Sequence, residues 1–398
     1  MKKVLIFSHA LELGGAETAL LGLLESIDKT EYSIDLFLMR HKGELFPYIP
    51  SDINLLREIP QYASLAVPMT CVLKKRQFGV LFGRLKAKIK AKRRVKELQL
   101  KGDNDVGLQL SHKYTLKSMP QISDTEYDLA ISFLTPHYFV AEKVKAKKKI
   151  AWIHTDYSTV SIDKEEQLRM WNKYDYIASI SDNVTESFVS VFPSLKEKIV
   201  LIENILPKKY ILSKIDEFSV ESEMPDDGSI KLLSIGRFCT AKNFDNVPNI
   251  CKRLIDKGLN VKWYLIGYGG DEQLIRDKIV ESEMQDRVVI LGKKENPYPY
   301  IKACNIYVQP SRYEGKSVSV REAQILNKPV IITAYATSGS QLKDGFDGVI
   351  VPMDNEGCSE GIARVIEDKE LQQRFIENTK ACDYTNSEEI EKIYKLIG

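Results

Sequence analysis

The sequence predicts an α/β protein with two doubly wound domains, and two observations support this prediction. Short runs rich in Val, Ile and Leu alternate with amphipathic stretches along the chain, which is typical of parallel sheets with helices on both faces. The chain has 398 residues, more than a single hydrophobic core usually supports. Two domains of roughly 150–200 residues each are therefore expected.

The predicted strands form two sets separated by a polar segment. This segment, 206–230, contains Pro207, Pro225 and Gly228 and is typical of a linker. We predict Rossmann-like domains over 1–205 and 206–380, facing a central cleft, and a C-terminal helix over 381–398. The predicted strands are 4–8, 33–39, 128–134, 149–154, 176–181 and 199–204, then 231–236, 261–267, 288–292, 305–311, 329–335 and 348–352.

The composition argues against several classes of protein. The net charge is only +2, and no aromatic stacking pattern accompanies the basic residues, so a nucleic-acid partner is not expected. No run of about 18 apolar residues occurs, which predicts no transmembrane helix. The six Cys residues form no CxxC pair, so buried, reduced thiols and a cytoplasmic location are expected.

A basic segment, 74–101, interrupts the first domain. Glu97 is its single acidic residue, and apolar residues recur at roughly helical spacing at 78, 80, 81, 82, 85 and 89. A basic helix with an apolar stripe is typical of peripheral binding to an anionic membrane. The expected contacts are Lys86, Lys88, Lys90, Arg93 and Arg94. The alternative is a solvated insertion whose apolar side packs on its own domain.

Turns containing glycine follow the first strand of each predicted domain and are candidate phosphate sites. Gly14 and Gly15 open the first helix, whose N-terminus favours an anion. In the second domain, Gly236 and Arg237 are followed by Lys242, and a forked guanidinium with an ammonium group matches a diphosphate. The alternatives are an ordinary strand-to-helix turn and solvated basic residues in a loop.

Further polar groups occur at strand ends. His154 ends the strand 149–154 and is expected to point away from the core, with His137 as the competing candidate and a structural histidine as the alternative. In the stretch SRYEGKSVSVREAQ (311–324), Glu314 precedes a predicted helix and Glu322 lies eight residues later within it. Residues 267–271, GYGGD, are expected to form a tight turn, since they do not fit the dinucleotide fingerprint.

Taken in order, these motifs resemble glycosyltransferase family 4, the retaining sugar transferases of GT-B fold. The resemblance covers nearly the whole chain and is densest from 231 to 335, where KPVI at 328–331 also matches the family pattern. The residues YEGKS at 313–317 differ from the commoner Glu-Gly-aromatic form of this motif. They are similar to those of members that build bacterial surface polysaccharides. The resemblance also implies that the C-terminal helix crosses back onto the first domain.

The resemblance implies a role for each candidate residue. Four would be catalytic: Arg237 and Lys242 would bind the diphosphate and stabilise the leaving group, Glu314 would bind the donor sugar's hydroxyls, and His154 would lie near the reacting sugar. Glu322 would hold the ribose, Lys293 would lie near the base, and N–H groups from residues 315 to 318 would face phosphate or sugar oxygens. The implied donor-binding set is completed by Gly15, Gly236, Gly315, Lys316, Ser317 and Val318.

The function implied is retaining transfer of a sugar from a nucleotide sugar to a lipid-linked saccharide, for capsule or other surface polysaccharide, with the acceptor bound by the first domain. The enzyme would be cytoplasmic and peripheral on the inner face of the cell membrane. Arg237 and Lys242 would neutralise the charge of the leaving diphosphate, which is the role of a metal ion in other transferases. The D-x-D pattern at 103–105 follows no predicted strand. No metal or cofactor is therefore expected. The alternatives are a nucleotide-sugar epimerase and a catalytically silent paralogue that is the partner of another transferase.

Overall fold

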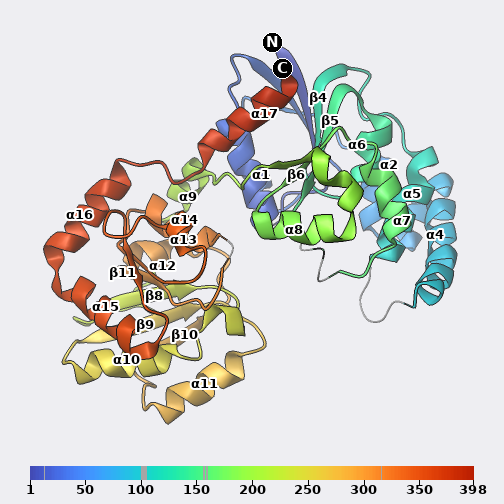
Figure 1. Cartoon of the computed structure of the whole chain (residues 1–398). Helices are drawn as coiled ribbons and strands as arrows, with labels where there is room; N and C mark the ends of the chain where they lie inside the picture. Colours follow the sequence, from blue (N-terminus) through green and yellow to red (C-terminus); the bar gives the residue numbers. More distant parts are fainter. Residues whose placement is uncertain (13, 100–104, 156, 158–159, 315) are drawn as a thin grey trace. The chain divides into compact units, whose positions relative to one another are not determined.

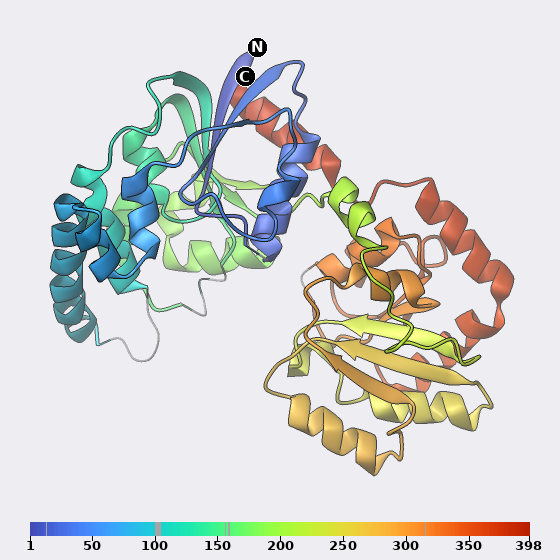
Figure 2. The same ribbon diagram turned by 180° about the vertical axis from the view of Figure 1, so that it is seen from behind.

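The computed structural model covers the whole chain and describes residues 1–12, 14–99, 105–155, 157, 160–314 and 316–398 (Figure 1, Figure 2). It divides into two compact units. Unit 1 contains Met1–Ile205 and Asn386–Gly398, and unit 2 contains Leu206–Thr385. Each unit has a parallel sheet with helices packed around it, so the predicted α/β fold class is confirmed.

Unit 1 is built on a sheet of seven parallel strands in the order β3-β2-β1-β4-β5-β6-β7. Val, Ile, Leu and Phe side chains of β1, β4 and β5 are almost fully buried, which explains the near-continuous apolar runs of these strands. The two-residue strand β3 is missed by the sequence pattern, because two residues carry no periodicity. The strands are β1 (Lys2–Ser8), β2 (Tyr32–Leu38), β3 (Asn54–Leu55), β4 (Glu126–Ser132), β5 (Lys145–Ile153), β6 (Tyr176–Ser179) and β7 (Ile199–Leu201).

The helices of unit 1 connect these strands, and two of them begin at capping side chains. Ser181 caps α8 by accepting a hydrogen bond from the N–H of Val184 (3.3 Å), a typical start for a helix. The α-helices are α1 (Gly15–Ser26), α2 (Pro60–Ala63), α3 (Met69–Lys74), α4 (Phe78–Glu97), α5 (Val106–Thr115), α6 (His137–Lys143), α7 (Lys164–Trp171), α8 (Asp182–Val191) and α17 (Ile390–Ile397). Short 3-10 turns are η1 (Phe46–Tyr48), η2 (Ser64–Ala66), η3 (Leu116–Ser118), η4 (Pro193–Lys198) and η6 (Ser387–Glu389).

The basic segment forms α4, which packs closely on α5. Ala87 and Ala91 of α4 are buried against Val106 and Leu110 of α5. A side chain at Gly83 would have its Cβ 2.8 Å from the carbonyl oxygen of Tyr114, so only glycine allows the two helices to approach this closely. The inner face of α4 is therefore made of small residues.

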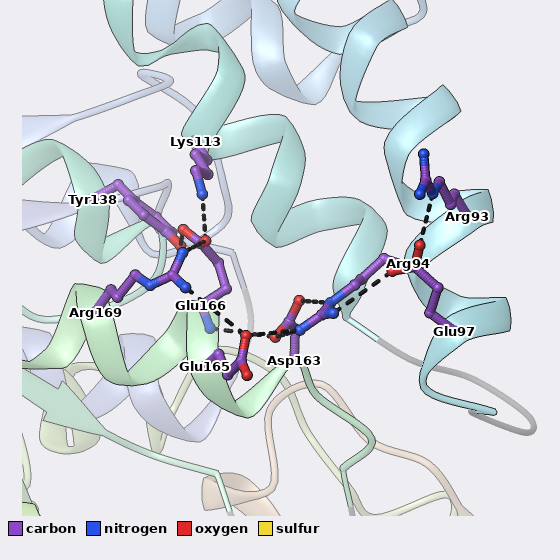
Figure 3. A network of polar contacts seen from close by, with 9 residues as sticks. All are labelled: Arg93, Arg94, Glu97, Lys113, Tyr138, Asp163, Glu165, Glu166 and Arg169. Carbon is purple, nitrogen blue, oxygen red and sulfur yellow. Dashed lines mark hydrogen bonds and ion pairs between the residues drawn. The ribbon is translucent and has the colours of Figure 1, made fainter.

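A network of ion pairs also fixes α4 and α5 to α7 (Figure 3). Asp163 caps α7 through the N–H of Glu166 (3.3 Å) and accepts two hydrogen bonds from Arg94 of α4, at 2.5 Å from Nε and 3.0 Å from Nη2. Glu166 accepts hydrogen bonds from Lys113 of α5 and from the hydroxyl of Tyr138 of α6 (2.9 Å). The Arg94 guanidinium lowers the pKa of Asp163, so the pair remains charged at neutral pH.

The C-terminal helix α17 belongs to unit 1. The ring of Tyr394 stacks on Tyr32 with centroids 4.5 Å apart, and its hydroxyl accepts a hydrogen bond from the N–H of Asp28 (2.7 Å). Within unit 1 the N- and C-termini lie side by side in both views (Figure 1, Figure 2). The segment that completes unit 1 begins at Asn386, whereas the sequence predicts its start at residue 381.

Unit 2 has a sheet of six parallel strands in the order β10-β9-β8-β11-β12-β13. Its strands are β8 (Ile230–Ile235), β9 (Val261–Ile266), β10 (Val288–Gly292), β11 (Ile306–Gln309), β12 (Val330–Thr333) and β13 (Val349–Val351). Its helices are α9 (Lys208–Lys214), η5 (Thr240–Lys242), α10 (Val247–Asp256), α11 (Glu272–Glu281), α12 (Tyr298–Ala303), α13 (Val318–Ile325), α14 (Ser338–Gln341), α15 (Asn355–Glu367) and α16 (Lys369–Lys380).

The predicted linker 206–230 is instead an ordered part of unit 2. It begins with α9, whose Tyr210 and Ile211 are buried, and Tyr210 contacts the ring of Tyr298 in α12 (6.1 Å between centroids). Met224, farther along the same segment, is 1% exposed. The polar composition suggested a linker because the few apolar residues that anchor this segment are widely spaced in the sequence.

Candidate functional site

The order of strands places the predicted donor-binding residues of unit 2 together. From β8 the chain adds β9 and β10 on one side of the sheet, and from β11 it adds β12 and β13 on the other side. The point between β8 and β11 is therefore a topological switch point. Ligands of such sheets bind there, beyond the carboxyl ends of the strands. Gly236, Arg237 and Lys242 follow β8, and Glu314 follows β11. Two motifs about 70 residues apart in the chain thus meet at one edge of the sheet.

An ion pair joins these two motifs. The ammonium group of Lys242 contacts Glu314 Oε1, and the two side chains are 17% and 10% exposed. Glu314 Oε1 also accepts a hydrogen bond from Ser311 Oγ (2.7 Å). A cation and a hydrogen-bonded carboxylate, partly shielded from water, are therefore fixed at the switch point of unit 2.

Gly236 leaves room for the Lys242 side chain, which passes close beside it. A Cβ at Gly236 would lie 3.0 Å from Lys242 Cε and 3.1 Å from Cδ, so a larger residue would push the lysine stem away. The predicted tight turn at 267–271 supports the same loop, because the N–H of Phe238 donates to the carbonyl of Tyr268 (2.9 Å). The turn therefore has a supporting role for the loop after β8.

Residues without a recognisable sequence signal hold the two loops together. Asn243 is 2% exposed, has φ of +60°, and donates from Nδ2 to the carbonyl of Pro310 (2.9 Å). Arg312 makes a forked pair with Asp245 at 2.8 and 2.7 Å. These contacts fix η5, and with it Lys242, against the end of β11. Asn243 stands next to the predicted Lys242, but its left-handed conformation could not be read from the sequence.

The residues between the two glutamates have different surroundings. Ser317 is 4% exposed, and its N–H donates to Gln341 Oε1 (2.7 Å). This N–H is therefore already satisfied and is not available to phosphate or sugar oxygens as predicted. Val318 begins α13 and is exposed, as is Lys316. Gly315 lies outside the residues that the structure describes.

Glu322 lies in the second turn of α13 and is 8% exposed. Its Oε1 accepts a hydrogen bond from the hydroxyl of Tyr298 (2.9 Å). Burial raises the pKa of Glu322 to about 7, and the hydrogen bond from Tyr298 opposes this shift only in part. The carboxyl group is thus balanced between its neutral and charged forms near neutral pH, which makes it sensitive to any donor that approaches it. Tyr298 is a partner that the sequence did not predict.

The two other predicted basic residues of unit 2 are exposed. Arg237 has no ion-pair partner in the described part of the chain, so its guanidinium is available to an anion. Lys293 follows β10, and its ammonium lies 5.5 Å from the ring centroid of Tyr268. Both side chains start from loops at the carboxyl ends of strands, where the prediction placed them.

Gly15 and His154 belong to unit 1. Gly15 is the first residue of α1, and a Cβ at this position would meet nothing within 4 Å, so there is open space beside it. His154 follows β5 and has its ring 4.7 Å from that of Phe133. Both ring nitrogens are buried without a hydrogen-bond partner in the described structure. Burial lowers the pKa of His154 to about 4, so the ring is neutral.

The described residues contain neither a cluster suited to a metal ion nor a helix suited to span a membrane. Over the described residues, no group of three or more His, Cys, Asp or Glu side chains is arranged to hold a metal ion; Asp103 and Asn104 of the D-x-D pattern lie outside that range. No helix in the described ranges combines the length and apolarity needed to cross a bilayer.

Comparison with known proteins shows what unit 2 is similar to. Residues 216–381 match the family Glycosyl transferases group 1. Among curated relatives, the chain is 26% identical over 191 residues to the N-acetylgalactosamine-N,N'-diacetylbacillosaminyl-diphospho-undecaprenol 4-alpha-N-acetylgalactosaminyltransferase of Campylobacter jejuni, covering 46% of this chain and 52% of the relative. It is 24% identical over 229 residues to the capsular polysaccharide biosynthesis glycosyltransferase CapM of Staphylococcus aureus, covering 52% and 60%.

The fold of the whole chain is similar to that of solved structures. Anabaena Alr3699/HepE, solved in complex with UDP-glucose, superimposes with a TM-score of 0.57 at 14% identity, covering 99% of this chain and 100% of that one. The GT-B assignment is thereby supported at the level of fold. The aligned regions span 38% to 65% of the length of eight curated relatives.

Proposed function

We propose that this protein is a retaining, metal-independent glycosyltransferase. It transfers a sugar from a nucleotide-diphosphate donor to a lipid-linked saccharide during synthesis of a surface polysaccharide. The relatives support this proposal, since one bears a diphospho-undecaprenol acceptor in its name and another is named for capsular polysaccharide.

The contact between Lys242 and Glu314 is the observation that carries the proposal. The lysine places a cation at the switch point of unit 2, where it would neutralise charge on the departing diphosphate. The exposed guanidinium of Arg237 would add a forked donor to the same anion. Glu314 would exchange its contact with Lys242 for hydroxyl groups of the donor sugar when the donor binds.

Binding of nucleoside diphosphates tests the donor site. We expect one of UDP, GDP or ADP, or a sugar conjugate of one of them, to raise the melting temperature of the full chain more than the monophosphate CMP does. A ligand at 100 times its Kd adds about 2.7 kcal/mol of stability. Arg237→Ala should weaken the shift, whereas Arg253→Ala, at an exposed position of α10, should not. If no nucleotide stabilises the wild type, the donor site is wrong and the silent-partner alternative is favoured.

Helix α4 supports binding to a membrane surface, because its apolar stripe faces outward. Phe78, Phe82, Leu85 and Ile89 are 52%, 66%, 40% and 70% exposed. Their spacing of 4, 3 and 4 residues puts them on one side of the helix, opposite the alanines that pack on α5. Packing within unit 1 therefore does not account for these side chains, and an exposed apolar strip flanked by basic residues is typical of an interfacial helix.

The basic residues of α4 divide between the two sides of the helix. Lys86, Lys88 and Arg93 are exposed beside the apolar stripe, and Arg93 also pairs with Glu97 (2.7 Å). Arg94 is not available to a membrane as predicted, because Asp163 and Glu165 bind its guanidinium on the inner side (Figure 3). Lys90 is exposed but borders the same ion network. We propose that the stripe inserts among anionic lipids while Lys86, Lys88 and Arg93 contact the headgroups.

Vesicle binding tests this surface. Phe82→Asp combined with Ile89→Asp should reduce binding to phosphatidylglycerol vesicles at least tenfold, because burial of two large apolar side chains is lost. The matched control is Val280→Asp, which changes an equally exposed apolar residue (60%) on α11 of unit 2. Binding by wild type should also weaken with added salt. Equal sedimentation of the α4 variant and the control with vesicles would disprove the membrane contact.

A further inference from the structure

Unit 1 contains a cavity of about 220 Å³ that the donor site does not use. Its walls are the neighbouring helices α5, α6 and α7 (Figure 1) together with Thr155, Tyr157 and Val160, which follow β5. Helix α6 follows β4 closely, so the cavity lies beyond the carboxyl ends of β4 and β5. This is the edge of a parallel sheet at which ligands bind.

Three buried polar groups of the cavity wall have unused hydrogen-bonding capacity. His112 is 7% exposed, and within the described residues its imidazole has no hydrogen-bond partner. Gln167, also 7% exposed, accepts at Oε1 from the hydroxyl of Tyr157 (2.9 Å) and from Trp171 Nε1 (3.2 Å). Its Nε2 donor is left without a partner among the described residues. Gln109 Oε1 is likewise buried and unpaired there.

Such groups are uncommon in native proteins, because buried polar atoms are nearly always paired. The cavity wall offers a donor at Gln167, an acceptor at Gln109, and an imidazole at His112 that can serve as either. A ligand with several hydroxyl or amide groups would satisfy all three. The unpaired atoms therefore point to an occupant that is polar and rich in both donors and acceptors.

The lining also sets the charge and size of the occupant. Among the residues that the structure describes, no Lys or Arg lines the cavity, and the one carboxylate there, Asp105, is exposed. Burial lowers the pKa of His112 to about 3, so this ring is neutral. A phosphate would find no cation here. The volume is below the roughly 300–1,000 Å³ of sites for drug-sized ligands, which fits one ring, and Trp171 and Met170 provide an apolar wall.

We infer that this cavity binds a single neutral sugar ring of the acceptor, held by Gln109, His112 and Gln167. This inference rests on the proposed function, because it assigns the saccharide part of the acceptor to unit 1. The ion network of Asp163 and Glu166 (Figure 3) joins α5, α6 and α7, and therefore keeps the walls of the cavity together.

Ligand-observed saturation-transfer NMR on the full chain tests the inference. The probes are the methyl glycosides of glucose, galactose, N-acetylglucosamine and N-acetylgalactosamine, with UDP added separately as a donor-site probe. We expect at least one glycoside to bind. Gln109→Leu and His112→Phe should each weaken its binding about tenfold and leave the binding of UDP unchanged.

The stability of the variants separates a binding role from a structural one. Both substitutions remove a polar group that has no partner among the described residues, so neither should lower the melting temperature. The matched control is Gln77→Leu, which removes another buried and unpaired amide oxygen outside the cavity and should leave glycoside binding unchanged.

The outcomes distinguish this inference from the proposed function. If UDP binds but no glycoside does, or if glycoside binding is the same in Gln109→Leu, His112→Phe and Gln77→Leu, the inference is wrong while the donor site stands. If glycosides bind in the manner expected but no nucleotide does, the cavity binds sugar and the transferase proposal fails.

Discussion

Replacing Lys242 with alanine is expected to lower the rate of sugar transfer about 100- to 1,000-fold. Removal of one group that stabilises developing charge in a transition state typically has an effect of this size. Lys242 is only 17% exposed and is held at the switch point by the loop after β8. Its charge is therefore only partly screened by water and positioned before the donor arrives.

The measurement is the initial rate of transfer with the nucleotide sugar that stabilises the wild type. Lys252→Ala, which removes a lysine from α10 that is 3.9 Å from Glu283, should retain full activity. Because Lys242→Ala leaves Glu314 without its cation, the double variant Lys242→Ala with Glu314→Gln checks for an indirect effect of folding. Activity within a few-fold of wild type in a folded Lys242→Ala protein would contradict the assigned role.

Glu322→Gln is expected to stabilise unit 2 at alkaline pH while weakening the binding of the donor. The pKa of Glu322 in the folded protein is about 7, above its ordinary value of 4.5. Between pH 4.5 and 7 the carboxyl group is therefore protonated in the folded state and ionised in the unfolded state. Stability therefore falls as pH rises from about 4.5 to 7 and is level above 7. At about 1.4 kcal/mol per pKa unit, the loss is about 3 kcal/mol.

Glutamine avoids this loss because it remains neutral and keeps an oxygen to accept from Tyr298. The variant should match the wild type near pH 4.5 and exceed its stability by up to about 3 kcal/mol at pH 8. Unfolding of unit 2 can be followed by hydrogen exchange of amides in β11 and β12. Glu283→Gln, at a position that is exposed, is the control and should show no such dependence on pH. A constant difference between variant and wild type across this range would rule out a raised pKa.

Apart from the two-residue strand β3, the strands of both sheets were predictable, because buried parallel strands have continuous apolar runs. The tight turn at 267–271 was also predicted, although its contact with the loop at 236–238 was not. Two local predictions failed where a few long-range contacts outweigh composition. The segment 206–230 is held by residues such as Tyr210 and Met224, and the N–H of Ser317 is taken by Gln341, 24 residues away.

The sequence also indicated which residues of α4 are apolar and basic, but not which side of the helix each one occupies. All the apolar residues between 78 and 89 were candidates for the same stripe. Packing on α5 buries Ala87 and packing in the main core of unit 1 buries Val80, whereas Phe82 and Ile89 remain exposed. Likewise, in the sequence Arg94 is one of many cations in a basic run. In the structure it binds Asp163, which lies 69 residues later in the chain.

By itself, the sequence determined the α/β class, the positions of the strands and the loops that carry the candidate donor site, because these depend on local apolar patterns and on which residues follow a strand. The tertiary structure decided which of those loops meet. Strand β11 pairs with β8, although β9 and β10 lie between them in the chain, and this pairing brings Lys242 to Glu314. It also created the cavity of unit 1 and the outward face of α4. Both depend on which side chains are buried by segments that are distant in the sequence, and local sequence patterns do not show that burial.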